Sequence, residues 1–237
     1  MKKLLVLSLI VSAFGSAQAI TLFSNGPVVS GTPSLSVIRT GGTTFGVGAQ
    51  GAIPNLVAED FTVGGPGWNV ESLNFYSYQS FAASAFTFTN VNWSIVSGNV
   101  NTGTVIASGT TAATNGGLLG YRVTATTLTN TDRAIFQLNV NIPDVVLTAG
   151  SYWMRWGMTG TAASGPWQPP TSDGLIGNAQ QSLANAAFAA IVDTGDTFGV
   201  TLPFAIQGSV IPEPGTYALM LAGGLAVAAV VRRRRQG

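Results

Sequence analysis

Apolar and polar residues alternate along several short stretches of this 237-residue chain, and this period of two restricts its fold more than any other feature. The clearest stretch is 136–142, where Phe, Leu, Val and Ile alternate with Gln and Asn. Successive side chains of a β-strand point to opposite faces of its sheet. The pattern therefore predicts a strand with one apolar face and one amide-lined face.

Further strands are expected at 35–39, 60–63, 69–78, 85–89, 91–95, 104–107, 121–127, 152–158 and 201–207. Turn residues separate them, including Gly64-Gly65-Pro66-Gly67, Asn115-Gly116-Gly117 and Ala149-Gly150. Only 178–191 is ambiguous, because its alanines permit a helix while its β-branched and aromatic flanks favour a strand. Short strands at this spacing predict an all-β fold, namely an antiparallel β-sandwich or jelly-roll-like single domain.

The chain contains no Cys and no His, and its only lysines are Lys2 and Lys3. It therefore lacks an imidazole base, a thiolate nucleophile, a Ser-His-Asp triad and the Cys and His ligands of zinc sites. Beyond residue 3 it also lacks the lysine of a Schiff base or of a phosphate-binding loop. These absences predict a protein that is not an enzyme.

The first 19 residues contain two lysines, an apolar run at 4–14 and a small-residue site that ends in Ala17 and Ala19. This order is typical of a secretory signal peptide, which signal peptidase would cut after Ala19. The apolar run is too short to span ~30 Å of hydrocarbon as a helix. We therefore expect 1–19 to be removed and the rest to be exported across the inner membrane.

The C-terminus has three parts in order: Pro212-Glu213-Pro214, an uncharged run at 216–231, and the cluster Arg232, Arg233, Arg234 and Arg235. The run predicts one C-terminal transmembrane helix of about 24 Å, with arginines that snorkel to the lipid headgroups. Positive residues stay on the cytoplasmic side, so the arginines would leave the body outside. The prolines keep the preceding segment extended, as a protease substrate requires. A permanent anchor is the alternative.

This tripartite C-terminus, together with Val210 and Ile211 before it, resembles the PEP-CTERM sorting signal of exported proteins of Gram-negative bacteria. The resemblance covers 210–237, and the accompanying signal peptide makes it specific. It implies that exosortase, a membrane-embedded protease or transpeptidase, recognises Pro212, Glu213 and Pro214 in its substrate. Cleavage near this motif would release or transfer the body towards the cell surface or extracellular matrix.

The two ends divide the chain into a signal peptide at 1–19, a loop-rich lead-in at 20–56, a β-sandwich domain at 57–208 and the sorting signal at 209–237. Between Ile20 and Val210 there are four arginines and eight acidic residues, so the body carries a net charge of −4. The whole chain carries +1 because its ends are basic. This distribution gives no reason to expect a nucleic-acid partner.

Six segments of the body carry a second resemblance: 59–63, 68–70, 75–79, 150–153, 165–170 and 203–208. They are similar to a predicted jelly-roll-like module of bacterial exported proteins. This resemblance spans about residues 57 to 208. It implies a fold and gives no residue a catalytic role.

Aromatic residues offer a candidate binding site. Trp167 lies in a proline-stiffened loop, and with Trp153 and Tyr78 it would provide a platform on which sugar rings stack. Trp93 and Trp156 instead fall in apolar phases and are expected in the core. The alternative for Trp167 is an aromatic cap on the end of the sandwich. The sequence therefore leaves open whether the protein binds a polysaccharide.

Acidic residues allow two further hypotheses. Asp193 and Asp196, or Glu59 and Asp60, are weak candidates for a calcium site, because calcium takes six to eight oxygen ligands. A pair of carboxylates would also suit glycoside hydrolysis. The stretch Asp193-Thr194-Gly195 resembles the active-site loop of aspartic proteases, but it occurs once, and Asp196 stands where that family has Ser or Ala. We favour solvated turns, and we expect no metal or cofactor apart from this open calcium question.

The sorting signals and the missing catalytic residues together predict an exported, non-enzymatic envelope or extracellular-matrix protein with a structural or adhesive role. It would be anchored in the membrane by its C-terminal helix until exosortase acts. A carbohydrate-binding module of the cell surface is the first alternative. A carboxylate-pair hydrolase is the second.

Overall fold

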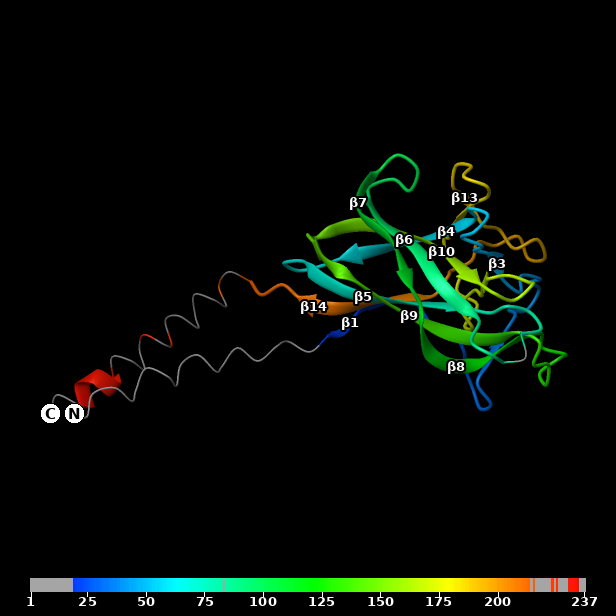
Figure 1. Cartoon of the computed structure of the whole chain (residues 1–237), viewed down its shortest axis with the longest axis horizontal. Helices are drawn as coiled ribbons and strands as arrows, with labels where there is room; N and C mark the ends of the chain where they lie inside the picture. Colours follow the sequence, from blue (N-terminus) through cyan, green and yellow to red (C-terminus); the bar gives the residue numbers. More distant parts are fainter. Residues whose placement is uncertain are drawn as a thin grey trace.

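The computed structural model describes residues 19–82, 84–213, 215, 223, 225 and 230–234. In these residues the chain folds into two six-stranded β-sheets and a two-stranded ribbon (Figure 1). The all-β fold and the antiparallel sandwich-like arrangement are therefore confirmed.

The first sheet contains both ends of the body. In spatial order its strands are β1 (Ile20–Ser24), β14 (Phe204–Val210), β5 (Trp68–Ser77), β9 (Ala134–Leu147), β8 (Thr114–Val123) and β2 (Leu35–Val37). Neighbouring strands are antiparallel except β2 and β8, which are parallel. The terminal strands of the body, β1 and β14, thus lie next to each other.

The second sheet is antiparallel throughout. Its strands, in spatial order, are β13 (Ala189–Ala190), β12 (Gln180–Ser182), β4 (Leu56–Val63), β10 (Gly150–Gly160), β6 (Phe88–Ser97) and β7 (Thr104–Ala112). A separate ribbon pairs β3 (Val47–Gly48) with β11 (Trp167–Gln168). This ribbon extends the end of the sandwich where β5 finishes, because Trp167 also bridges to Tyr78.

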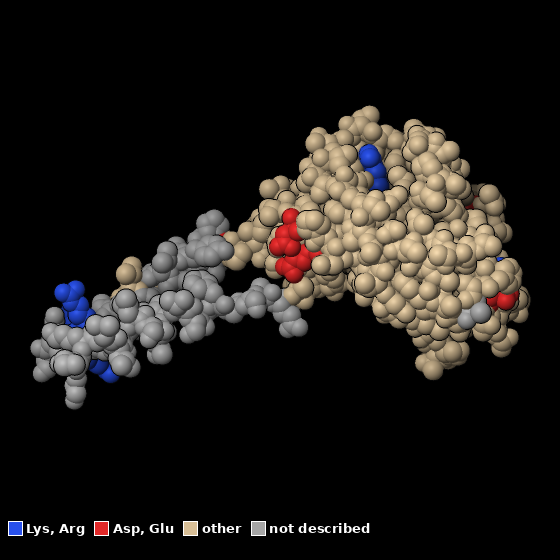
Figure 2. Space-filling model, viewed as in Figure 1, with Lys and Arg blue, Asp and Glu red and all other residues tan. Residues whose placement is uncertain are grey.

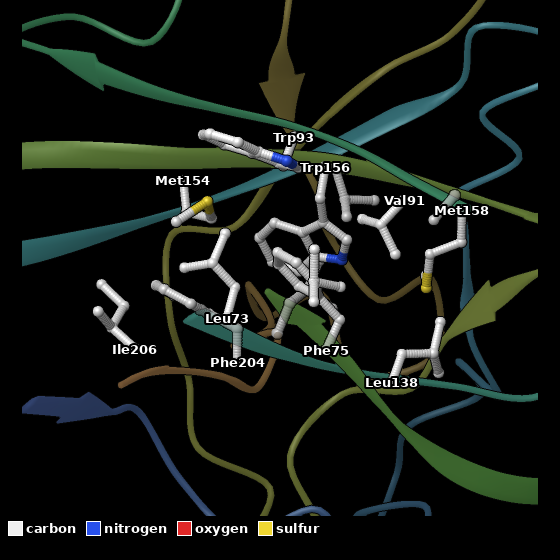
Figure 3. Packing of buried hydrophobic residues seen from close by; sticks show 14 of the residues in the cluster. Leu73, Phe75, Val91, Trp93, Leu138, Met154, Trp156, Met158, Phe204 and Ile206 are labelled. Atoms are coloured by element: carbon white, nitrogen blue, oxygen red, sulfur yellow. The ribbon is translucent and has the colours of Figure 1, made fainter. Parts of the chain in front are cut away.

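The core between the sheets is rich in aromatic rings, and Figure 3 shows Trp156 at its centre. The ring centroids of Phe75 and Trp156 are 5.2 Å apart, and those of Trp156 and Phe204 are 5.5 Å apart. All three side chains are fully buried. Stacked and tilted rings at these distances contribute about 0.5–1.5 kcal/mol per pair beyond area burial. The predicted core positions of Trp93 and Trp156 are confirmed.

The alternation that predicted the central strand is reproduced in β9. Phe136, Leu138, Val140 and Ile142 are buried, whereas the amides between them are not. The stretch expected at 91–95 lies within β6, which also includes residues 88 and 89 of the stretch expected at 85–89, whereas residues 85–87 lie outside any strand. The ambiguous stretch 178–191 contains β12 and β13, so its strand interpretation is the correct one.

One predicted turn is wrong. Asn115-Gly116-Gly117 lies within β8 and does not reverse the chain. Here the pairing of β8 with β9 jumps from Asn115↔Leu138 to Leu118↔Phe136. Gly117 has a φ of 109° and donates its N–H to Asn115 Oδ1. The turn-forming residues therefore produce a bulge, which glycine permits because it adopts positive φ freely.

The segment 20–56, expected to be rich in loops, contributes three strands to the body. β2 lies within the predicted stretch 35–39, whereas β1 and β3 were not expected. β1 pairs with β14 from Ile20↔Gly208 to Ser24↔Ala205. The chain thus enters the body at the point where it leaves, as the neighbouring labels of β1 and β14 in Figure 1 show.

Candidate functional site

The sorting segment begins where the folded body ends. Val210 pairs with Trp68 at the end of β14, and the N–H of Ile211 donates to the carbonyl of Gly67 at 3.0 Å. Pro212 and Glu213, the next two residues, are exposed. A protease therefore has access to the chain directly after the hydrogen bond from Ile211.

Several predicted features fall outside the described residues. These are residues 1–18 of the signal peptide, including Ala17; Pro214 of the motif; Arg235; and most of the predicted span 216–231. Ala19 is described and exposed, and Arg232, Arg233 and Arg234 are helical and exposed. Among the described residues, no helix combines the length and the apolar character that a membrane crossing demands.

The end of the body where Trp167 bridges to Tyr78, opposite the sorting segment, has an open cleft of about 380 Å³. Its lining residues come from three regions: Thr44, Gly46, Val47, Gly48, Gln50 and Asn55 from the chain around β3, Trp167 from β11, and Gln181, Leu183 and Ile191 from the chain around β12 and β13. None of these residues is charged, and charged side chains are also few on the face of the body that Figure 2 shows. We call this the Trp167 cleft.

Trp167 owes its position to its neighbour Gln168. The amide of Gln168 is fully buried, accepts the indole N–H of Trp156 at 3.1 Å and donates to the carbonyl of Pro203 at 3.1 Å. Adjacent side chains of a strand point in opposite directions, so Trp167 points away from this core contact. Its ring is half-buried, packs against the cluster around Tyr78 and lines the cleft.

The floor of the cleft requires glycine at position 46. A Cβ there would lie 2.6 Å from Tyr78 Oη, closer than real Cβ contacts, and 3.0 Å from Trp167 Cβ, which is tighter than most of them. Gly46 therefore lets the 44–48 segment approach the aromatic pair. Without this approach β3 would not pair with β11, and the cleft would lose one wall.

Three amide side chains line the cleft, and hydrogen bonds within the protein already occupy some of their donor and acceptor groups. Asn55 Nδ2 donates to Gln50 Oε1 at 2.9 Å, Asn55 Oδ1 accepts the N–H of Ala184 at 3.0 Å, and Gln181 Nε2 donates to the carbonyl of Gly48 at 2.8 Å. Within the described residues, Gln50 Nε2 and Gln181 Oε1 make no hydrogen bond to the protein. One donor and one acceptor thus remain open to a ligand.

The three predicted stacking residues are not brought together as a platform. Tyr78 is only 2% exposed, so its ring offers no open face, and it supports Trp167 from below through paired backbone hydrogen bonds of 3.0 and 3.1 Å. Trp153 lies on the outer face of the second sheet, between Asp60 of β4 and Val96 of β6. Of the three, only Trp167 lines the cleft.

A larger groove of about 610 Å³ lies between β7 and the end of β9. Its aromatic residue is Trp93, which is 5% exposed and donates its indole N–H to Thr111 Oγ1 at 3.0 Å. Asp144 adds a negative charge to its lining. Because the groove presents no open aromatic face, it is a poorer site for stacking than the smaller Trp167 cleft.

Asp193 acts as an acceptor of backbone hydrogen bonds. Its carboxylate accepts the N–H groups of Thr43, Thr44 and Gly195 at 2.8–3.0 Å, and it is 2% exposed. Burial opposes its charge, but the hydrogen bonds from Gly195 and Thr44 outweigh burial and hold the pKa of Asp193 well below its usual range. This carboxylate holds the 43–44 segment next to the cleft.

Asp196, the second calcium candidate, is paired with Arg39. The guanidinium donates to both carboxylate oxygens, from Nε and from Nη2. The hydrogen bond from Arg39 lowers the pKa of Asp196. A cation would have to displace Arg39 here and would meet N–H donors at Asp193. Among the described residues, no group of three or more acidic side chains is placed to hold a metal ion.

We therefore expect the midpoint of thermal unfolding to be the same in excess calcium chloride and in EDTA. An ion that binds only the folded state stabilises it by RT ln(1 + [L]/Kd), so any specific site would raise the midpoint with calcium concentration. Differential scanning calorimetry of the wild type is the measurement. A midpoint that rises steadily with calcium and falls on chelation would contradict the structural role of both carboxylates.

Glu59 and Asp60, the other pair of calcium candidates, are not brought together at one site. They are adjacent on β4 and therefore point to opposite faces: Glu59 is 3% exposed, and Asp60 is exposed to solvent. Glu59 Oε2 accepts the N–H of Leu202 at 2.7 Å. Burial raises the pKa of Glu59 to about 8. The hydrogen bond from Leu202 lowers this pKa, and the negative charge of Asp60 raises it by a smaller amount. No acidic residue lines the Trp167 cleft.

A buried residue that the sequence did not single out connects the cleft to the first sheet. Arg122 of β8 is 2% exposed, and its guanidinium donates to Phe45 O at 2.9 Å, Thr44 O at 2.8 Å and Ser36 Oγ at 2.9 Å. Burial lowers the pKa of Arg122 to about 10, so it remains charged at neutral pH. Arg122 and Asp193 thus hold the 43–45 segment by its carbonyl and N–H groups respectively.

Comparison with known families identifies the C-terminal end of the chain. Residues 210–235 match the family model of the PEP-CTERM protein-sorting motif. The match confirms the resemblance seen in the sequence and indicates an exported protein that exosortase sorts. A comparison with curated proteins found no match.

Proposed function

We propose that the protein is an exported, non-enzymatic component of the cell surface or extracellular matrix with an adhesive or structural role. The observation that carries this proposal is that the chain leaves the body at one end and the Trp167 cleft lies at the opposite end. β5 begins at Trp68, beside Val210, and runs to the end where Tyr78 meets Trp167. At about 3.3 Å per residue, the exit of the chain and the Trp167 cleft are roughly 30 Å apart.

This placement of the chain ends and the cleft at opposite ends of the body supports a transient membrane anchor. The signal peptide precedes β1, and the sorting signal follows β14, so both apolar ends join the body at one end. A body held at the membrane by either end would turn the Trp167 cleft outward. Removal of the signal peptide by signal peptidase, and of the tail by exosortase near Pro212, leaves every strand of the body intact.

A carbohydrate-binding module is the second candidate function, and the Trp167 cleft favours it. The cleft joins a half-buried indole to amides with open donor and acceptor groups. A carboxylate-pair hydrolase has less support, since the cleft has no carboxylate to act as an acid or base.

Two variants test the sorting proposal in the native host. One lacks residues 212–237, and the other keeps the tail but carries Pro212→Ala, Glu213→Ala and Pro214→Ala. We expect the truncated body to fold normally, because its last hydrogen bond comes from Ile211, and to be missing from the surface fraction. The motif variant should keep its C-terminal tail and remain in the membrane fraction, because exosortase no longer recognises it.

Cell fractionation followed by immunoblotting is the measurement. The matched control is a triple alanine variant at Thr126, Leu128 and Thr129, three exposed residues between β8 and β9, which should be distributed like the wild type. If the motif variant reached the surface in its processed form, the proposed role of Pro212, Glu213 and Pro214 would be wrong.

A further inference from the structure

The Trp167 cleft has the size of a small-molecule site. Its volume of about 380 Å³ lies within the range of roughly 300–1,000 Å³ typical of ligand pockets. Its walls come from segments around residues 48, 167 and 181, which β-pairing and hydrogen bonds hold together. The site is therefore part of the folded body.

The lining of the cleft indicates an uncharged ligand. Apolar surface comes from Val47, Trp167, Leu183 and Ile191, and polar surface comes from a threonine and three amides. No lysine, arginine, aspartate or glutamate lines it. A charged ligand would give up part of its hydration there without gaining an opposite charge, so the lining favours an uncharged ligand.

The open groups in the cleft match a ring with hydroxyl groups at its edge. The face of an indole is electron-rich and attracts the weakly positive C–H bonds of an apolar ring face. Gln50 Nε2 offers a donor, and Gln181 Oε1 offers an acceptor. A pyranose has both an apolar face and hydroxyl groups that donate and accept, so its chemistry matches the indole, the donor and the acceptor that line the cleft.

We propose that the Trp167 cleft binds an uncharged polysaccharide, with a pyranose ring stacked on Trp167 and its hydroxyl groups hydrogen-bonded to Gln50 and Gln181. This proposal rests on the adhesive role proposed above and names its partner. Tyr78 takes no direct part and holds Trp167 in position. Trp153 lies outside the site.

Affinity electrophoresis and isothermal titration calorimetry of the full chain in detergent test the proposal. The probes are dextran, laminarin and galactomannan as uncharged polysaccharides, and alginate and polygalacturonate as charged ones. We expect binding to at least one uncharged probe and none to the charged probes. Trp167→Ala should weaken that binding roughly tenfold or more, the equivalent of about 1.4 kcal/mol.

Trp153→Ala is the matched control, because it makes the same change on the outer face of the second sheet and should leave affinity unchanged. Gln50→Ala and Gln181→Ala should each weaken binding several-fold and keep the unfolding midpoint near that of the wild type. If Trp167→Ala fails to fold, these two variants still test the proposal. Trp167→Phe, which keeps an aromatic face, should retain most of the affinity.

Three results would overturn the proposal: binding that prefers alginate or polygalacturonate, binding to an uncharged probe that Trp167→Ala and both glutamine variants leave unchanged, and no binding to any probe. Each of these is distinct from failure of the sorting proposal. The fractionation experiment measures where the protein goes, and the titration measures what the purified chain binds.

Discussion

Replacing Arg122 with Met is expected to lower the free energy of unfolding by about 3–5 kcal/mol, because three hydrogen-bond acceptors lose their donor. The guanidinium is buried and donates to the carbonyls of Thr44 and Phe45 and to Ser36 Oγ. Methionine fills similar space but donates no hydrogen bond, so these acceptors become buried and unpaired. Each unpaired buried group costs about 1–3 kcal/mol.

In a body of this size, the loss corresponds to a fall of the unfolding midpoint by roughly 10 °C, which calorimetry measures directly. The matched control is Arg133→Met. The Arg133 guanidinium lies 3.9 Å from the ring centroid of Phe45 and is half-buried, so its loss should cost less than about 1 kcal/mol. Equal effects of the two changes would show that the Arg122 hydrogen bonds do not stabilise the 43–45 segment.

The Arg122 change should also weaken the binding proposed for the Trp167 cleft. Thr44 and Gly46 line the cleft, and Arg122 holds the chain between them through the carbonyl of Phe45. Binding should be weaker in Arg122→Met even at temperatures where the protein stays folded. In Arg133→Met it should persist.

Stability of the wild type should fall as the pH rises from about 4.5 to about 8, and Glu59 is the cause. Burial raises the pKa of Glu59 from 4.5 to about 8. Below pH 4.5 the carboxyl is protonated in both states and has no effect. Between the two pKa values the unfolded state releases this proton while the folded state retains it, so the free energy of unfolding falls by about 1.4 kcal/mol per pH unit.

Summed over this window, the loss is on the order of 5 kcal/mol. Glu59→Gln removes the titration and keeps an oxygen to accept the N–H of Leu202, so the variant should be more stable than the wild type at pH 8.5. Urea unfolding at several pH values is the measurement. Asp60→Asn, a change at the exposed neighbour, should leave the wild-type pH dependence in place. A flat wild-type profile between pH 4.5 and 8 would contradict the buried state of Glu59.

The sequence predicted the long strands because their own alternation encodes them. β9 and β10 each bury one face over several residues, and this local pattern is visible without knowledge of the partner strands. β1, β3 and β11 have two to five residues and form because of pairing with distant segments. Their stability comes from partners more than 100 residues away in the chain, which no local pattern reveals.

The candidate site was predicted only in part, for the same reason. A tryptophan in a proline-flanked loop pointed to Trp167, but Gln50 and Gln181 come from segments that meet only in the folded body. The prediction that Tyr78 stacks on a sugar ring was wrong, because its side chain is buried. Tyr76, Ser77, Tyr78 and Gln79 are all buried, so this stretch has no alternation that distinguishes a buried tyrosine from an exposed one. Asp193 and Asp196 resembled calcium ligands because their N–H and guanidinium partners lie about 150 residues away.

The most direct test of the account is the intact mass of the protein recovered from the cell surface or medium. The account predicts a mature chain that begins at Ile20 and ends close to Pro212, a folded body without either apolar end. Peptide mapping of its termini would place both cuts. A surface or medium protein whose mass still includes the C-terminal segment through Gly237 would contradict its removal by exosortase and the surface function inferred from it.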